Sequence, residues 1–257
     1  MVQLRWTTRR QTMGLAALLT ALIAVFNARP ADAQATGRGF LFGVPAGAVT
    51  LRGGVDRANA GSDLFAFVTD ELTLTKGDFR AKTIGGEVSV SLKPRIAAVF
   101  GAAFSRTNAS SEFRHWLDNR DLPIKQTTGL RRAPITAGIK VALTPSGHSI
   151  GRLAWIPARF SPYVGAGGGM MYYQFRQSGD FIDFDTTRVF FDLFTSSGWT
   201  PTAHGLAGLD VSLNPRVVFT TEAKYEWARS GLSEDFSGFD RIDLSGLKMT
   251  VGVSFRY

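Results

Sequence analysis

The sequence predicts an all-β fold: an eight-stranded antiparallel up-and-down transmembrane β-barrel with long external loops. Three observations predict it. Several segments alternate apolar side chains with small or polar ones over the length that a strand needs to cross a membrane. Beyond residue 33, no run of 18 uninterrupted apolar residues is present to form a membrane-spanning helix. The connections between the alternating segments are short and long in turn.

The N-terminal residues have the pattern of a secretory signal peptide. Arg5, Arg9 and Arg10 precede an apolar run at 13–26, and Ala31-Asp32-Ala33 has the small-residue form that signal peptidase accepts. Because the run falls short of the roughly 20 residues of a membrane-spanning helix, cleavage after Ala33 is favoured over a retained anchor. We therefore predict a signal peptide at 1–33, an N-terminal periplasmic extension at 34–46 and a barrel domain at 47–257.

Composition excludes several chemistries. The chain has no Cys, which rules out disulfides, Cys-based zinc sites and a thiol nucleophile. Part of the net charge of +8 belongs to the predicted signal peptide, and the remaining basic excess is spread along the chain. We therefore expect no nucleic-acid partner.

Alternation of side chains defines the strands in order. In the first, Val49 and Leu51 oppose Thr50 and Arg52; in the last, the odd positions of 247–257 are apolar and the even positions small or polar. The third of the eight, 96–105, is too rich in Ala for its inward and outward faces to be assigned with certainty. The predicted strands lie in the segments Val49–Val55, Val88–Leu92, Ile96–Ser105, Ile135–Leu143, Pro162–Phe175, Leu209–Leu213, Val217–Trp227 and Leu247–Tyr257.

The connections give the barrel its orientation. Lys93-Pro94-Arg95 and Asn214-Pro215-Arg216 are tight turns, whereas the segments 56–78, 108–125, 177–199 and 230–240 are long. Barrels of the outer membrane have short periplasmic turns and long external loops. The even number of strands then places both ends of the chain on the periplasmic side. The connection 145–161 is an exception, and we expect its Trp155 and Phe160 along the inner membrane interface.

Two segments carry a resemblance to a known superfamily. The strand opening at 162–169, Pro-Tyr-Val-Gly-Ala-Gly-Gly-Gly, and the terminal segment 251–257 resemble the small outer-membrane β-barrels of the OmpA, OmpX, opacity-protein and OmpW type, over about 47–257. No subfamily is identified. The resemblance implies a monomer in the bacterial outer membrane, surrounded by outer-membrane lipid and lipopolysaccharide. It also implies recognition by the barrel-assembly machinery through a terminal signal consisting of Val251, Val253, Phe255 and Tyr257.

The alternation of odd and even positions along each strand, which we call parity, places equal numbers of positive and negative side chains inside the predicted barrel. The four cations and four anions are Arg52, Glu87, Lys140, Asp210, Glu222, Lys224, Glu226 and Lys248. Because an eight-stranded barrel has room only for its own side chains or one small ligand, these charges predict a paired network that closes the lumen. The alternative is a narrow pore that conducts when the pairs rearrange.

Two surface features suggest external partners. A lipopolysaccharide-binding rim, as an alternative to an ordinary charged rim, would comprise Arg114, Arg120, Lys125, Arg131 and Arg132. An apolar mouth for small molecules, as an alternative to strands that continue above the membrane, would comprise Phe181, Phe184, Phe190, Phe191, Phe194 and Trp199. Leu64, Phe65, Phe67 and Val68 of the first long loop could complete the mouth.

The expected function is structural or surface-interacting, with a largely occluded lumen, a loop ligand that stays unidentified and no catalysis. A narrow channel or an OmpW-like portal for small apolar molecules is the alternative, and a lipid-modifying enzyme is a distant third. Deacylases that resemble this fold use His and Ser two residues apart, whereas His148 directly precedes Ser149 here. We expect no cofactor and no metal, since neither His115 nor His204 has the spacing of a metal ligand or catalytic triad.

Overall fold

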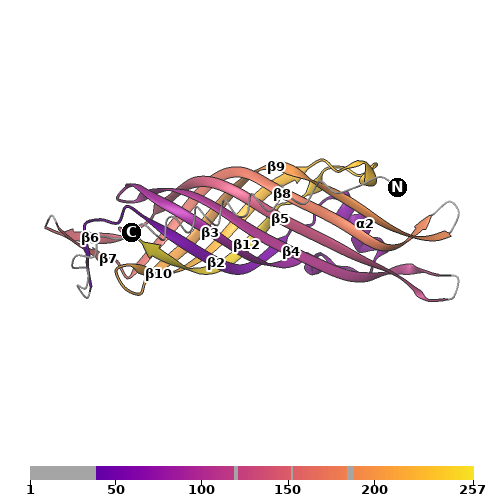
Figure 1. The fold of residues 1–257 in the computed structure, drawn as a ribbon, viewed down its shortest axis with the longest axis horizontal. Helices are drawn as coiled ribbons and strands as arrows, with labels where there is room; N and C mark the ends of the chain where they lie inside the picture. Colours follow the sequence, from indigo (N-terminus) through magenta and orange to yellow (C-terminus); the bar gives the residue numbers. More distant parts are fainter. Residues whose placement is uncertain (1–38, 119–120, 152, 184–187) are drawn as a thin grey trace, which may run out of the picture. The chain divides into compact units, whose positions relative to one another are not determined.

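The computed structural model describes residues 39–257 except 119–120, 152 and 184–187, so the predicted signal peptide and its cleavage site lie outside the described residues. The unit Gly39–Tyr257 contains a ring of eight antiparallel strands (Figure 1). The strands of the ring, in order, are β2 (Gly47–Ala58), β3 (Arg80–Lys93), β4 (Ile96–Leu117), β5 (Pro123–Ala142), β8 (Phe160–Asp183), β9 (Arg188–Ser212), β10 (Val217–Ser230) and β12 (Gly246–Arg256). The ring closes because β2 pairs with both β3 and β12. The predicted fold class is confirmed.

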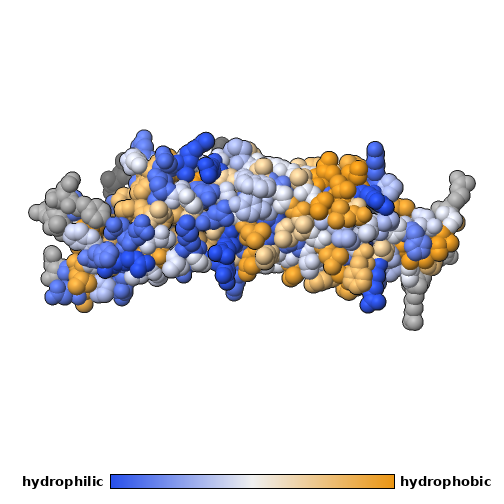
Figure 2. Space-filling view, turned by 180° about the vertical axis from the view of Figure 1, so that it is seen from behind, coloured by the Kyte–Doolittle hydropathy of each residue, from blue (hydrophilic) through white to orange (hydrophobic). Residues whose placement is uncertain are grey.

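Side chains alternate between a polar interior and an apolar exterior. Ile84, Phe100 and Ile135 point outward and are 67%, 57% and 54% exposed, whereas Thr50 and Glu222 point inward and are 3% and 6% exposed. In water such an exterior would be unfavourable, but lipid solvates it. Figure 2 shows apolar side chains gathered over the half of the barrel that includes the chain's C-terminal end, and mainly hydrophilic ones over the other half. The described strands therefore form a closed β-barrel whose apolar outer surface is typical of barrels that span a membrane.

Aromatic side chains mark the membrane boundary nearer the long loops. Tyr172 on β8 lies opposite Trp199 on β9, with ring centroids 5.6 Å apart, and Tyr225 lies 4.8 Å from Trp227 on β10. Amphipathic rings at this level are typical of the aromatic girdles of membrane barrels. No helix among the described residues is long and apolar enough to cross a membrane.

The strands continue well beyond the membrane at the loop end. β8 has 24 residues and β9 has 25, whereas about 9–11 suffice to cross a bilayer. The predicted loops 108–125 and 177–199 are therefore wrong as loops, since most of their described residues extend the β4–β5 and β8–β9 hairpins. The alternative interpretation of 177–199, strands that continue above the membrane, is confirmed. Polar side chains outside the apolar belt allow this, because water replaces lipid around the extended hairpins.

The connection 145–161 forms a small sheet at the periplasmic end. β6 (Gly147–Ile150) and β7 (Ala154–Pro157) make a hairpin, and β1 (Leu41–Phe42) of the N-terminal extension pairs with β7. The expectation that Trp155 lies along the inner interface is wrong. It is 4% exposed, and the guanidinium carbon of Arg256 lies 5.3 Å from its ring centroid.

The external half of the barrel is filled by its own loops. The β2–β3 connection contains α2 (Asp63–Glu71) and η1 (Lys76–Phe79), and the β10–β12 connection contains η2 (Glu234–Phe236) and β11 (Ile242–Asp243). Leu64, Phe65 and Val68 of α2 are fully buried in an apolar cluster that includes strand residues such as Phe175 and Leu130. We call this apolar cluster the plug.

Polar contacts hold the plug in place. The Asp240 backbone N–H donates to Asp63 Oδ2 at 2.8 Å, which joins the two long connections. The Thr73 backbone N–H donates to the Glu112 carbonyl at 2.8 Å, which joins the first connection to the wall. In η1, the Thr75 backbone N–H and hydroxyl donate to the Asp78 carboxylate and lower the pKa of that group below its ordinary value.

The β4–β5 ladder is interrupted in the wall of the barrel, in addition to a register shift between Glu112 and Leu117 near its external end. Pairing runs from Ile96↔Val141 to Ala102↔Ile135 and resumes in the same register at Ser105↔Arg132. The intervening stretch includes Pro134, which has no backbone N–H to donate. Pro134 therefore cannot donate a ladder hydrogen bond at this level of the wall, where residues 103 and 104 have no paired residue on β5.

Candidate functional site

The barrel interior brings together all eight charges that parity predicts. Even positions of β2, β5, β9, β10 and β12 face the lumen, and β3 contributes Glu87 at an odd position. Side chains on a strand point alternately to its two faces. Once one inward residue of a strand is known, every second residue of that strand is therefore also inward.

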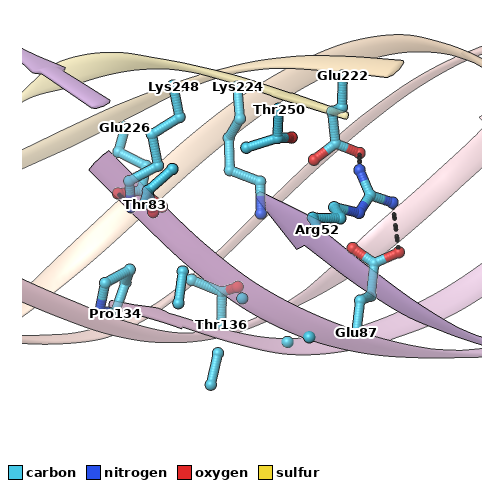
Figure 3. Close-up of a pocket in the computed structure, with 15 residues that line it drawn as sticks. Arg52, Thr83, Glu87, Pro134, Thr136, Glu222, Lys224, Glu226, Lys248 and Thr250 are labelled. Carbon is cyan, nitrogen blue, oxygen red and sulfur yellow. Dashed lines mark hydrogen bonds and ion pairs between the residues drawn. The ribbon is translucent and has the colours of Figure 1, made fainter. Parts of the chain in front are cut away.

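The largest cluster joins two cations and two carboxylates. Arg52 Nη2 lies 3.2 Å from Glu87 Oε1, and Arg52 Nη1 lies 2.5 Å from Glu222 Oε2 (Figure 3). Lys140 Nζ donates to Glu87 and lies 3.2 Å from Glu222 Oε2. We call these four residues the charge layer. Each cation contacts both anions, so the charges of the layer balance, and its side chains reach across the interior from β2, β3, β5 and β10.

Tyr163 of β8, which is not among the predicted lumen residues, completes this layer. Its hydroxyl donates to Glu222 Oε2 at 3.0 Å and lies 3.2 Å from Thr220 Oγ1. Lys140 Nζ lies 4.8 Å from the centroid of its ring. The hydrogen bond that Tyr163 donates to Glu222 and its cation–π contact with Lys140 compensate for the burial of these charges.

A second pair lies nearer the plug. Lys248 Nζ donates to Glu226 Oε2 at 2.6 Å, with both side chains at least 95% buried. Lys224 lies between this pair and the charge layer, and within the described residues it has no carboxylate within 4.0 Å (Figure 3). A cavity of about 50 Å³ separates the two groups, which is room for only a few water molecules.

A third pair was missed, and it corrects one prediction. Arg132 does not lie on the rim: it points into the barrel, is 2% exposed, and places Nη2 2.5 Å from Asp56 Oδ1. Ser105 donates to the other Asp56 oxygen at 2.6 Å, and Arg132 donates to the Leu244 carbonyl at 2.8 Å. Parity could have found this pair, because both positions continue the inward series of their strands. The predicted strands ended too early.

The interior thus contains three parts along its length. The plug fills the external half, the charged pairs cross the middle, and a cavity of about 520 Å³ opens at the periplasmic end below Arg52 and Lys140. Asp210 and Arg256 line that cavity. Within the described residues, Asp210 makes no ion pair within 4.0 Å, so the predicted network includes it by location and not by pairing.

The three histidines do not converge. His204 lies in the lumen at 3% exposure, and its Nδ1 has no hydrogen-bond partner among the described residues. His115 is on the β4 extension and His148 on β6, at opposite ends of the barrel. No group of three His, Asp or Glu side chains suited to a metal occurs among the described residues.

The predicted lipopolysaccharide rim is only partly at the outer surface. Arg114 is exposed and donates to the Leu74 carbonyl at 3.3 Å, and Lys125 is exposed with its Nζ 3.8 Å from Glu112. Arg131 points outward, with its guanidinium carbon 5.8 Å from the Phe104 ring centroid. Arg120 lies outside the described residues.

The predicted apolar mouth does not assemble as one surface. Phe181 and Phe194 pack edge to face with centroids 4.6 Å apart, and Phe194 packs against the plug. Phe190 and Phe191 are exposed on the β9 extension, and Trp199 faces the membrane boundary. Phe184 lies outside the described residues. The period of two along β9 sends these rings to different sides, which a list of aromatic residues does not reveal.

The first long loop closes the space that the predicted mouth would need. Leu64, Phe65 and Val68 are buried in the plug. Phe67 points away from it, and its ring centroid lies 5.5 Å from that of Phe239. These residues fill the barrel entrance and do not line an opening.

Comparisons with known proteins find outer-membrane proteins among the similar solved structures. No family model matches the chain, and no curated protein matches it. Similar solved structures include Neisserial surface protein A (12% identity, TM-score 0.45, 84% of this chain and 99% of that one) and OprG of Pseudomonas aeruginosa (15%, 0.46, 84% and 99%). The outer membrane protease OmpT of Escherichia coli is also similar (10%, 0.31, 87% and 100%). At these identities the likeness does not extend to function.

Proposed function

We propose that this protein is an occluded outer-membrane β-barrel with a structural or surface-interaction role and no catalysis. The observation that carries the proposal is the double closure of the lumen by the plug and the charged pairs. An ion crossing the barrel would have to displace a fully buried apolar cluster and also break neutralised pairs. Neither barrier leaves a continuous polar path of the kind that a pore requires.

Single-channel recording tests the proposal. The protein is refolded in detergent, its folding is confirmed by the different gel mobilities of unboiled and boiled samples, and it is inserted into a planar bilayer. We expect silence from protein that shows the gel shift. Stable, ion-dependent current steps from the same folded sample would overturn the proposal.

A second candidate is a lateral portal for small apolar molecules, and one observation favours it. The interruption at Pro134 adjoins the 50 Å³ cavity, whose lining also includes Ala102 and Ala103. A wall that lacks ladder hydrogen bonds costs less to open toward lipid than a continuous one. Against this route, charged Lys224, Glu226 and Lys248 line the same cavity.

A further inference from the structure

The outer surface of the barrel carries six basic side chains on five consecutive strands. They are Arg57 on β2, Arg80 and Lys82 on β3, Arg106 on β4, Arg131 on β5 and Arg176 on β8. All six occupy outward positions of their strands, and we call them the outer basic patch. Only Arg131 belongs to the rim predicted from sequence.

Strand register brings these six residues together. Arg57 pairs directly with Arg80, Lys82 with Arg106, and Arg106 with Arg131. Arg176 follows two residues after Gln174, the partner of Arg131. Neighbouring strands lie about 4.8 Å apart and same-face residues about 6.6 Å apart, so each basic group has others within reach of one multivalent anion.

The protein itself does not neutralise the patch. Within the described residues, none of the six makes an ion pair with a carboxylate within 4.0 Å. Arg131 Nε is buried and has no hydrogen-bond acceptor there. Like charges directly opposite one another in a sheet repel, so three such pairs in adjacent positions favour an anion bound from outside.

The level of the patch identifies where that anion lies. On the membrane side, the next outward residues are apolar: Val55 beside Arg57, Ile84 beside Lys82 and Phe104 beside Arg106. On the neighbouring wall, Tyr172 and Trp199 mark the same boundary of the membrane. The patch therefore lies at the external surface of the bilayer, at the depth of lipid phosphate groups.

We propose that the outer basic patch binds the phosphate groups of lipopolysaccharide in the outer leaflet. Arginine presents forked N–H donors that match phosphate oxygens in pairs, and five of the six residues are arginines. The lipid's acyl chains would lie against the apolar belt directly below. This inference rests on the outer-membrane location and is independent of whether the lumen conducts.

Lipid binding by a charge-neutralised variant tests the proposal. The patch variant is Arg80→Gln/Arg106→Gln/Arg131→Gln, and the matched control is Lys93→Gln/Arg95→Gln/Arg216→Gln, which removes three exposed charges from the periplasmic turns. Each protein is refolded in zwitterionic detergent, and folding is verified by the gel shift. Titrations use short-chain bisphosphorylated lipopolysaccharide, its dephosphorylated form, phosphatidylglycerol and inorganic phosphate.

We expect the native protein and the control to bind bisphosphorylated lipopolysaccharide at least tenfold more tightly than the dephosphorylated form. The patch variant should lose that preference, and the native preference should weaken with added salt. Equal affinities of patch variant and control would overturn the proposal. So would equal binding of phosphatidylglycerol, or displacement of the lipid by millimolar inorganic phosphate, because either would mean that any phosphate suffices. Current steps from the folded protein would overturn the occluded-barrel proposal alone.

Discussion

At the scale of single residues, Glu222 joins three neighbours in the charge layer. Its carboxylate accepts hydrogen bonds or ion pairs from Arg52, Lys140 and Tyr163. Replacing it removes one of two anions that neutralise two buried cations. A buried charge left without its partner costs far more than an exposed pair contributes.

Glu222→Gln should therefore destabilise the folded barrel by about 3–5 kcal/mol. Glu112→Gln is the matched control, because Glu112 and Lys125 form an exposed pair at 3.8 Å, and it should change stability by no more than about 0.5 kcal/mol. Urea unfolding in lipid vesicles, followed by the gel shift, measures both. Similar effects of the two substitutions would mean that the charge layer does not stabilise the closed lumen.

At the scale of elements, the β4–β5 ladder depends on the residue at position 134. Pro134→Thr restores a backbone donor where pairing is interrupted. One added hydrogen bond contributes about 0.5–1.5 kcal/mol, so amides at 102–105 should exchange roughly 2- to 10-fold more slowly. Hydrogen exchange read by mass spectrometry checks this, with Thr136→Ser on the same strand as the control.

The same variant separates the two candidate functions. If small apolar molecules leave through the wall, Pro134→Thr should reduce their uptake into vesicles containing the protein, whereas Thr136→Ser should not. Unchanged uptake alongside slowed exchange would exclude the interruption as an exit.

At the scale of the whole molecule, the plug couples the long connections to the barrel wall. Phe65 is fully buried, with its ring centroid 4.8 Å from Phe79 and 5.6 Å from Phe175. Its neighbour Phe67, on the same helix, is 39% exposed. Replacing each ring in turn therefore compares a side chain packed inside the barrel with one on the surface.

Phe65→Ala should lower stability by about 3–5 kcal/mol, because it opens a cavity in a closely packed cluster. Phe67→Ala should cost roughly 1 kcal/mol, since most of what it removes is already in contact with water. Thermal loss of the gel shift compares the two variants. Equal midpoints would contradict a packed plug and would weaken the argument for a closed external half.

The sequence predicts which face of each strand points inward, but not how far each strand runs. Parity placed Arg52, Lys140 and Glu222 in the lumen because side chains on a strand alternate without exception unless a bulge intervenes. Asp56 and Arg132 were missed because the predicted strands stopped at the end of the apolar belt. Outside the membrane the inward face becomes apolar where Leu130 and Phe175 pack into the plug, so the alternation no longer has the polar-inside, apolar-outside pattern of a membrane strand.

By itself, the sequence determined the barrel class, the orientation of the strands and the polarity of the interior, because each depends on the local period of two and on connection length. Only the tertiary structure decided that Leu64 and Phe65 enter the barrel, which charges pair, and that Arg57, Arg80 and Arg106 lie side by side. Those contacts join residues far apart in the chain. Strand register and loop packing determine these contacts, and the residue pattern of a single segment predicts neither.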